Sequence, residues 1–159
     1  MVNSHLSHKP ISLATQVLVM KQRFPNFSVR WHKNIVYWIG EVQPTSLSKR
    51  YLIRIIHQLH SVPQVFVLRP KLEETDSGPV PHTYPDNRLC LYRPRKHEWS
   101  HQKLIAETIV PWVSLWLYYY EVWQVTREWL GGGEHPQVGH AAKSPINIIR
   151  QLDSEGAND

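Results

Sequence analysis

The chain contains a single cysteine, Cys90, among its 159 residues. A lone thiol cannot close a disulfide within the chain, so a disulfide-stapled secreted scaffold is excluded. Zinc ribbons and iron–sulfur centres that are held by several thiolates are excluded for the same reason. A chain of this length buries roughly 70% of its unfolded surface and needs no such staple to fold. We therefore expect one domain in a reducing compartment.

Long hydrophobic segments are also absent. The longest uncharged apolar stretch, residues 108–120, contains Pro111 and lies between Glu107 and Glu121. A membrane-spanning helix takes about 20 apolar residues, so this stretch is expected to be a buried segment of the fold. Residues 1–10 are polar and lack the apolar core of a signal peptide. These observations predict a cytoplasmic protein without a membrane partner.

Acidic residues are fewer than basic ones. The chain has 13 Asp and Glu against 18 Lys and Arg, which gives a net charge of +5. This mild excess favours an acidic or phosphate-bearing partner, but it is too small to identify a nucleic-acid-binding protein. Hydrophobic residues make up 42% and charged residues 19% of the chain. That balance is typical of a folded domain and not of a disordered chain.

Hydrophobic spacing predicts a helix followed by four strands. Apolar side chains recur at helical spacing in residues 11–24, with Pro10 suited to the first turn. Phe27, Val29 and Trp31 then alternate with polar residues, which is typical of a half-buried strand. Four segments have the pattern or composition of strands: residues 27–31, 35–42, 51–59 and 65–68. Their short connections favour an antiparallel meander.

The rest of the chain predicts a long loop and a large helix, which makes the fold class α+β. Residues 71–95 are rich in proline and lack periodicity, and long irregular segments of this kind often carry function. Residues 111–129 are apolar on both helical faces, so we expect a helix that either lies at the centre of the core or has one face in the core and the other at an interface. The glycines at 131–133 are expected to end this helix. The predicted parts are a flexible N-terminus (1–10), a single domain (11–136) and a tail (137–159) with one short helix (146–152).

Cys90 is the candidate nucleophile. Basic residues surround it in the sequence: Arg88, Arg93, Arg95 and Lys96. Positive charge stabilises a thiolate, and a nearby histidine can orient or deprotonate the thiol. The candidate histidines are His82, His97 and His101. The alternative interpretation is a buried, inert side chain, because free cysteine is among the most buried residue types.

Two other interpretations of this region stay open. The first is a nucleic-acid or nucleotide binding patch formed by the basic segment from Arg88 to Lys96. In this interpretation Tyr92 and Trp99 would stack on the bases. No helix-turn-helix, zinc finger or glycine-rich phosphate loop accompanies it. His97 and His101 with Cys90 would supply three metal ligands, but their spacing matches no zinc signature. We therefore predict no metal and no cofactor.

Short motifs accompany this order of elements: residues 62–66 (VPQVF), 81–84 (PHTY), 88–91 (RLCL) and 99–100 (WS). In order, they resemble the proline-lysine-valine strand start, the histidine-proline-asparagine turn, the cysteine segment and the tryptophan-serine step of ubiquitin-conjugating enzymes. The resemblance covers about residues 11–125. It implies the ubiquitin-conjugating (UBC) fold, with an N-terminal helix, a four-stranded meander, a long active-site loop and a large central helix.

A closer likeness lies in the aromatic and glycine-bearing segments: residues 89–92, 99, 111–112, 116–117, 119–121 and 128–133. These resemble the small stand-alone conjugating-enzyme-like proteins of bacterial CBASS antiphage systems, which sit beside a cGAS-like nucleotidyltransferase (the cyclase). The resemblance implies a thioester between the cyclase's C-terminal carboxylate and Cys90. It also implies transfer of that acyl group to an amine of an acceptor protein, which primes antiphage signalling.

The resemblance also assigns roles to individual residues. Cys90 would hold the acyl group, and His82 would hold the active-site loop. Thr83 and Tyr84 stand where the family has proline and asparagine, so the Tyr84 hydroxyl or the Asn87 amide is expected to replace the family's oxyanion donor. This departure leaves open a catalytically silent adaptor that binds the cyclase. The apolar outer face of the large helix leaves open the cyclase or a second copy of the chain as its partner.

Overall fold

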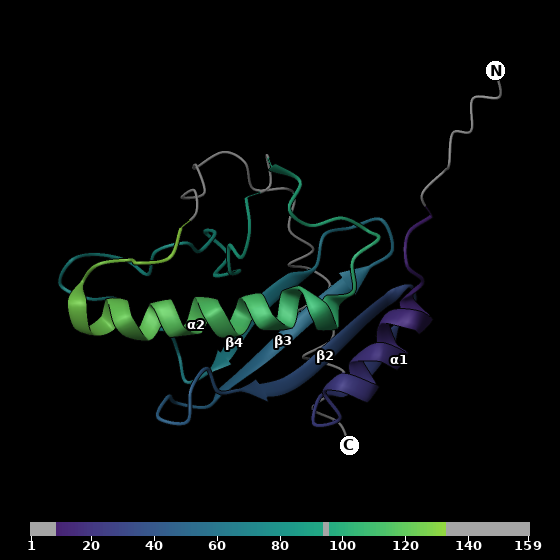
Figure 1. Cartoon of the computed structure of the whole chain (residues 1–159), viewed down its shortest axis with the longest axis horizontal. Helices are drawn as coiled ribbons and strands as arrows, with labels where there is room; N and C mark the ends of the chain where they lie inside the picture. The colour runs from purple at the N-terminus through teal and green to yellow at the C-terminus, as the bar shows by residue number, and fades with distance from the viewer. Residues whose placement is uncertain (1–8, 94–95, 133–159) are drawn as a thin grey trace.

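A helix, a four-stranded sheet, an irregular segment and a long helix follow one another in the computed structural model (Figure 1). The structure describes residues 9–93 and 96–132, so the predicted helix at 146–152 lies outside the described residues. The elements are α1 (Leu13–Arg23), β1 (Ser28–His32), β2 (Ile35–Val42), β3 (Tyr51–Gln58), β4 (Gln64–Arg69), the 3-10 helix η2 (Ile105–Glu107) and α2 (Ile109–Thr126). This order confirms the α+β class and is compatible with a UBC-like fold.

The four strands form one antiparallel sheet in the order β1-β2-β3-β4, as the meander prediction requires. Figure 1 shows α2 lying across one face of this sheet. Fully buried side chains from the two layers meet there: Val36, Trp38, Ile53 and Ile55 from the strands and Val113 and Leu117 from the helix. The core therefore lies between the sheet and α2, and the loop after β4 closes around it.

The prediction that β1 is half-buried was wrong for two of its residues. Trp31 is 51% exposed and Val29 is 37% exposed, although both alternate with polar residues as a core-facing pair would. Within the described residues β1 pairs with β2 alone and forms one edge of the sheet, so little covers its side chains. Phe27, just before the strand, is the residue of this pattern that packs on the core, against Gly40.

A buried glutamine attaches helix α1 to the segment that precedes α2. The helix begins at Leu13 and not near Pro10, because the Ser12 side chain caps it by accepting from the Thr15 N–H. Gln16 is 1% exposed. Its Nε2 donates to the Lys103 carbonyl at 3.0 Å, and its Oε1 accepts from the Ile105 N–H at 2.9 Å. This amide pairs with two backbone groups of the segment that leads into η2 and α2.

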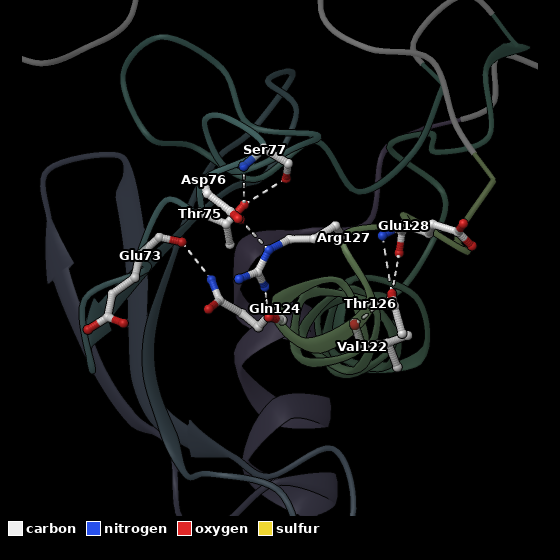
Figure 2. A network of polar contacts seen from close by, with 9 residues as sticks. All are labelled: Glu73, Thr75, Asp76, Ser77, Val122, Gln124, Thr126, Arg127 and Glu128. Atoms are coloured by element: carbon white, nitrogen blue, oxygen red, sulfur yellow. Dashed lines mark hydrogen bonds and ion pairs between the residues drawn. The ribbon is translucent and has the colours of Figure 1, made fainter.

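The predicted end of the large helix was wrong. Helix α2 ends at Thr126, before the glycines, and Arg127 takes the left-handed conformation with φ of 65°. Figure 2 shows the contact that favours an arginine at this position, in which Arg127 Nε donates to Asp76 Oδ1 at 2.5 Å. The Arg127 backbone N–H also donates to the Trp123 carbonyl. Gln124 Nε2 also donates to the Glu73 carbonyl at 2.6 Å. The loop after β4 thus fixes the end of α2.

The two faces of α2 differ, so of the two predicted alternatives a helix buried on all sides is excluded. One face is buried, whereas Leu115 is 50% and Tyr118 is 43% exposed on the other. Tyr119 is half-buried, because Gly131 packs against its ring. Among the described helices, none combines the length and hydropathy needed to span a bilayer. That the exposed face binds the cyclase or a second copy stays a prediction.

Candidate active site at Cys90

Backbone hydrogen bonds fix the position of Cys90 in the loop between β4 and α2. The Leu89 N–H donates to the Val65 carbonyl in β4 at 2.9 Å. The Cys90 N–H donates to the His82 carbonyl at 2.9 Å, and a bridge joins Thr83 to Leu89. The cysteine segment is therefore held against both the sheet and the turn that precedes it.

His82 lies at the centre of this arrangement. It is 5% exposed and has a φ of 52°. Its carbonyl accepts from the Trp116 Nε1–H of α2 at 3.2 Å, besides the bond from Cys90. Its ring lies 4.8 Å from the ring of Trp129. This is where a residue that holds the loop would lie, and its role in catalysis stays a prediction.

The Cys90 thiol opens onto a small cavity. Its side chain is half-buried, with Sγ 3.9 Å from the Tyr84 hydroxyl and 3.7 Å from the Tyr92 carbonyl. The cavity has a volume of about 250 Å³. Its lining residues are His82, Cys90, Leu91, Tyr92, Arg93, Glu98 and Gly132. A thiol on a cavity wall fits a nucleophile better than it fits an inert core side chain.

The Tyr84 hydroxyl lies beside the Cys90 thiol and is protonated. Burial, and then the neighbouring Cys90, raises the pKa of Tyr84 to about 12. The Arg88 guanidinium lies over the tyrosine ring, 4.3 Å from its centroid. At neutral pH the phenol therefore keeps its proton and is available as a hydrogen-bond donor beside Cys90.

Asn87 lies at the turn that carries Tyr84 and not at the cavity wall. It is exposed and has a φ of 66°, a conformation that asparagine tolerates better than most residues. Its N–H donates to the Tyr84 carbonyl at 2.9 Å, and the Tyr84 N–H donates to the Arg88 carbonyl at 2.8 Å. Asn87 thus helps to form the turn that carries Tyr84. Of the two predicted oxyanion donors, the fold brings Tyr84 to the thiol, and Asn87 is not among the residues lining the cavity.

The described members of the basic cluster differ in exposure. Arg88 is 6% exposed, and its Nε lies 3.7 Å from Asp86 Oδ1. Lys96 is exposed, and Arg95 lies outside the described residues. Arg93 is the described member of the cluster that lines the Cys90 cavity. Burial of Arg88 against Asp86 and Tyr84 weakens the prediction of a nucleic-acid patch, because such a patch needs its cations at the surface.

Two of the residues that line the cavity were not predicted from the sequence. Glu98 was not among the predicted site residues, yet its Oε2 accepts from the Arg93 N–H at the cavity wall at 2.8 Å. Gly132 was interpreted as a helix terminator, yet it forms another part of that wall. In residues 9–93 and 96–132, no three His, Cys, Asp or Glu side chains gather as metal ligands would. Cys90, His97 and His101 are therefore not brought together as a ligand set.

A buried histidine supports the end of the active-site loop. His57 of β3 is 3% exposed, and its ring packs edge-on against Trp99 at 5.8 Å. Trp99 in turn meets His101 at 5.3 Å. Burial chiefly, and then His101, lowers the pKa of His57 from 6.5 to about 4. Neutral His57 is therefore part of the folded state.

Stability is expected to fall in mild acid because of His57. Its pKa is lower in the folded chain, so the unfolded chain binds more protons between about pH 4 and 6.5. The contribution is complete above pH 6.5 and should decline by about 2 kcal/mol between pH 7 and pH 5. Urea denaturation across this range measures it. His57→Phe should flatten the slope and His32→Gln should leave it unchanged; an equal slope in all three proteins would contradict the assignment.

The fold and the cysteine loop are compatible with the ubiquitin-conjugating class of proteins. A family model described as Type II CBASS E2 protein matches residues 16–136, and the chain belongs to that family. This places the protein in the CBASS antiphage system and confirms the resemblance found in the sequence. A search of curated proteins finds no match to the chain.

Proposed function

We propose that this CBASS E2 protein is a thiol-dependent conjugating enzyme. Cys90 forms a thioester with the C-terminal carboxylate of a cGAS-like nucleotidyltransferase and then passes the acyl group to an amine of an acceptor protein. The observation that carries the proposal is the half-exposed Cys90 thiol on a cavity, with the Tyr84 hydroxyl 3.9 Å away. The proposed setting is the cytoplasm, where a single thiol stays reduced. Intact-mass spectrometry of the protein co-expressed with its cyclase tests the thioester directly.

The proposed reaction has two acyl-transfer steps. In the first, Cys90 Sγ attacks the carbonyl carbon of a carboxylate that is already activated as a thioester of an upstream protein. The new Sγ–carbon bond replaces the bond to the upstream thiol, which leaves with the proton of Cys90. In the second step the acceptor nitrogen bonds to the same carbon, the Sγ–carbon bond breaks, and a proton from the nitrogen restores the thiol.

Both steps pass through a tetrahedral intermediate whose oxygen carries negative charge. A donor that is already in place lowers the barrier, because no reorganisation is needed when the charge develops. The Tyr84 hydroxyl is held beside Sγ, and with a pKa raised to about 12 it stays protonated. We assign to the Tyr84 hydroxyl the oxyanion-donor role that asparagine has in the ubiquitin-conjugating enzymes that the sequence resembles.

Tyr84→Phe is expected to slow transfer to amines by about 100-fold, the usual cost of removing one oxyanion donor. Thioester formation should be largely spared, because thiolate attack has the lower barrier. Single-turnover discharge of the loaded protein measures both steps. The matched control is Tyr118→Phe, which removes an exposed hydroxyl on α2. Normal transfer in Tyr84→Phe would overturn the assignment to Tyr84. Asn87→Ala tests the other predicted donor, and normal transfer in both variants would leave neither residue as the oxyanion donor.

A catalytically silent adaptor is the second candidate. The observation that favours it is the sequence at the turn, where Thr83 and Tyr84 stand in place of the family's proline and asparagine. An adaptor would bind the cyclase through its surface and would not depend on the thiol. Replacing Cys90 by alanine separates the two functions, because an adaptor tolerates the change.

A further inference from the structure

The segment after α2 returns to the Cys90 loop through Trp129. Beyond the end of α2 the chain runs back along the helix (Figure 1). The centroid of the Trp129 ring lies 5.3 Å from that of Trp116 and 6.0 Å from that of Tyr119, both in α2. It lies closer still to the His82 ring, at 4.8 Å. Trp129 thus joins the segment after α2 to the turn that precedes Cys90.

His82 is the residue that this contact supports. Its φ of 52° lies in the left-handed region, where a residue other than glycine is strained and persists only if its surroundings hold it. Its carbonyl accepts from both the Cys90 N–H and the Trp116 Nε1–H. A change in the His82 backbone would therefore move the segment that carries the thiol. The Trp129 ring packs against the His82 ring and opposes such a change.

We propose that Trp129 is a positioning residue for the Cys90 thiol, and that it acts by holding His82 in its left-handed conformation. The inference deepens the proposed function and rests on it. Both acyl-transfer steps form or break a bond at Sγ, so their rates depend on where the thiol lies relative to the bound groups. Trp129 is not among the residues that line the cavity. Its effect on the reaction passes through the His82 carbonyl.

The ring of Trp129 makes this contact, and its N–H does not. Trp129 Nε1 is buried and has no hydrogen-bond partner in the part of the chain that the structure describes. Phenylalanine keeps an aromatic ring beside His82 and gives up only this unpaired N–H, so Trp129→Phe should behave as the wild type does. Trp129→Ala removes the ring and should release His82.

Gly131 offers a second way to disturb the contact, in which the indole is kept. A Cβ at this position would lie 2.6 Å from Tyr119 Cδ2 and 2.8 Å from Trp129 Nε1, closer than non-bonded atoms pack. Gly131→Ala should therefore displace the Trp129 ring, and it carries the test if Trp129→Ala does not fold. Leu130→Ala is the matched control, because Leu130 lies between the two residues and is 61% exposed.

Amide hydrogen exchange, followed by NMR in the full-length protein, tests the contact directly. We expect the Cys90 N–H to exchange about tenfold faster in the two variants that remove or displace the ring, because the His82 carbonyl is no longer fixed. The Leu89 N–H donates to the Val65 carbonyl in β4 and should exchange at the wild-type rate. The phenylalanine and Leu130→Ala variants should change neither rate. Equal acceleration at Leu89 and Cys90 would indicate a general loss of stability and would overturn the inference, as would an unchanged rate at Cys90.

The same variants test the link to the proposed reaction. The full-length protein is loaded at Cys90 by exchange with a synthetic peptide thioester, and its discharge to hydroxylamine is then timed. Trp129→Ala should slow loading and discharge by about tenfold, as a small misplacement of a reacting group does. Trp129→Phe should restore both rates, and Leu130→Ala should match the wild type.

The two measurements separate failure of this inference from failure of the proposed function. Normal acyl-transfer rates in Trp129→Ala would overturn the positioning role, even if the Cys90 N–H exchanges faster. If the wild-type protein takes up no acyl group from the peptide thioester or in co-expression with its cyclase, the proposed function fails. The exchange rates by themselves then decide whether Trp129 holds the Cys90 segment.

Discussion

Replacing Cys90 by alanine is expected to abolish conjugation, with a loss of about a thousandfold or more, as removal of a nucleophile generally costs. The reason is chemical: in the proposed reaction the half-exposed Cys90 thiol at the cavity acts as the nucleophile, and the chain has no other cysteine. The wild-type protein, co-expressed with its genomic neighbours and kept free of reductant, should carry an adduct that added thiol releases. Cys90→Ser should carry a more persistent adduct, because an oxygen ester resists thiol. Intact-mass spectrometry distinguishes the three cases, and the adduct mass identifies the acyl donor.

The control for this experiment is a measurement of whether the two Cys90 variants still fold. Cys90 is half-buried, so serine and alanine should leave the melting temperature nearly unchanged. Full antiphage activity of Cys90→Ala, together with the absence of any adduct on the wild type, would support the adaptor instead. Loss of activity with a preserved fold supports the enzyme.

Gln16→Leu is expected to lower the free energy of unfolding by about 3 kcal/mol, the largest stability effect that we predict. Leucine is close in size, so the change removes hydrogen bonds more than it removes volume. It leaves the Lys103 carbonyl and the Ile105 N–H without the partners that the Gln16 amide now supplies. A buried backbone group that loses its hydrogen bond costs about 1–3 kcal/mol. Urea denaturation measures the difference.

The matched control is Gln22→Leu on the same helix. Gln22 is exposed, so its replacement should change stability by no more than about 0.5 kcal/mol. Equal stability of Gln16→Leu and the wild type would mean that the attachment of α1 to residues 103–105 does not depend on these bonds. A difference confined to Gln16 supports the attachment and explains why a glutamine lies among apolar residues.

The sequence by itself determined the elements and their order. The predicted strand at residues 35–42 matches β2 (Ile35–Val42), and the predicted strand at 51–59 matches β3 (Tyr51–Gln58) within one residue. Hydrophobic periodicity is a local property of the chain, and central strands of a sheet follow it closely. Cys90 could be chosen as the nucleophile because it is the only thiol. The motifs around it were sufficient to predict the family that residues 16–136 match.

Only the tertiary structure decided which side chains meet. Trp31 has the alternation of a core residue but is 51% exposed, because β1 is a sheet edge. Arg127 ends α2 in place of the glycines, because Asp76, distant in sequence, lies beside it. The cavity brings Cys90 together with Gly132 from beyond α2. Such contacts join segments far apart in the chain, so no local pattern of residues encodes them, and packing of the whole domain brings them together.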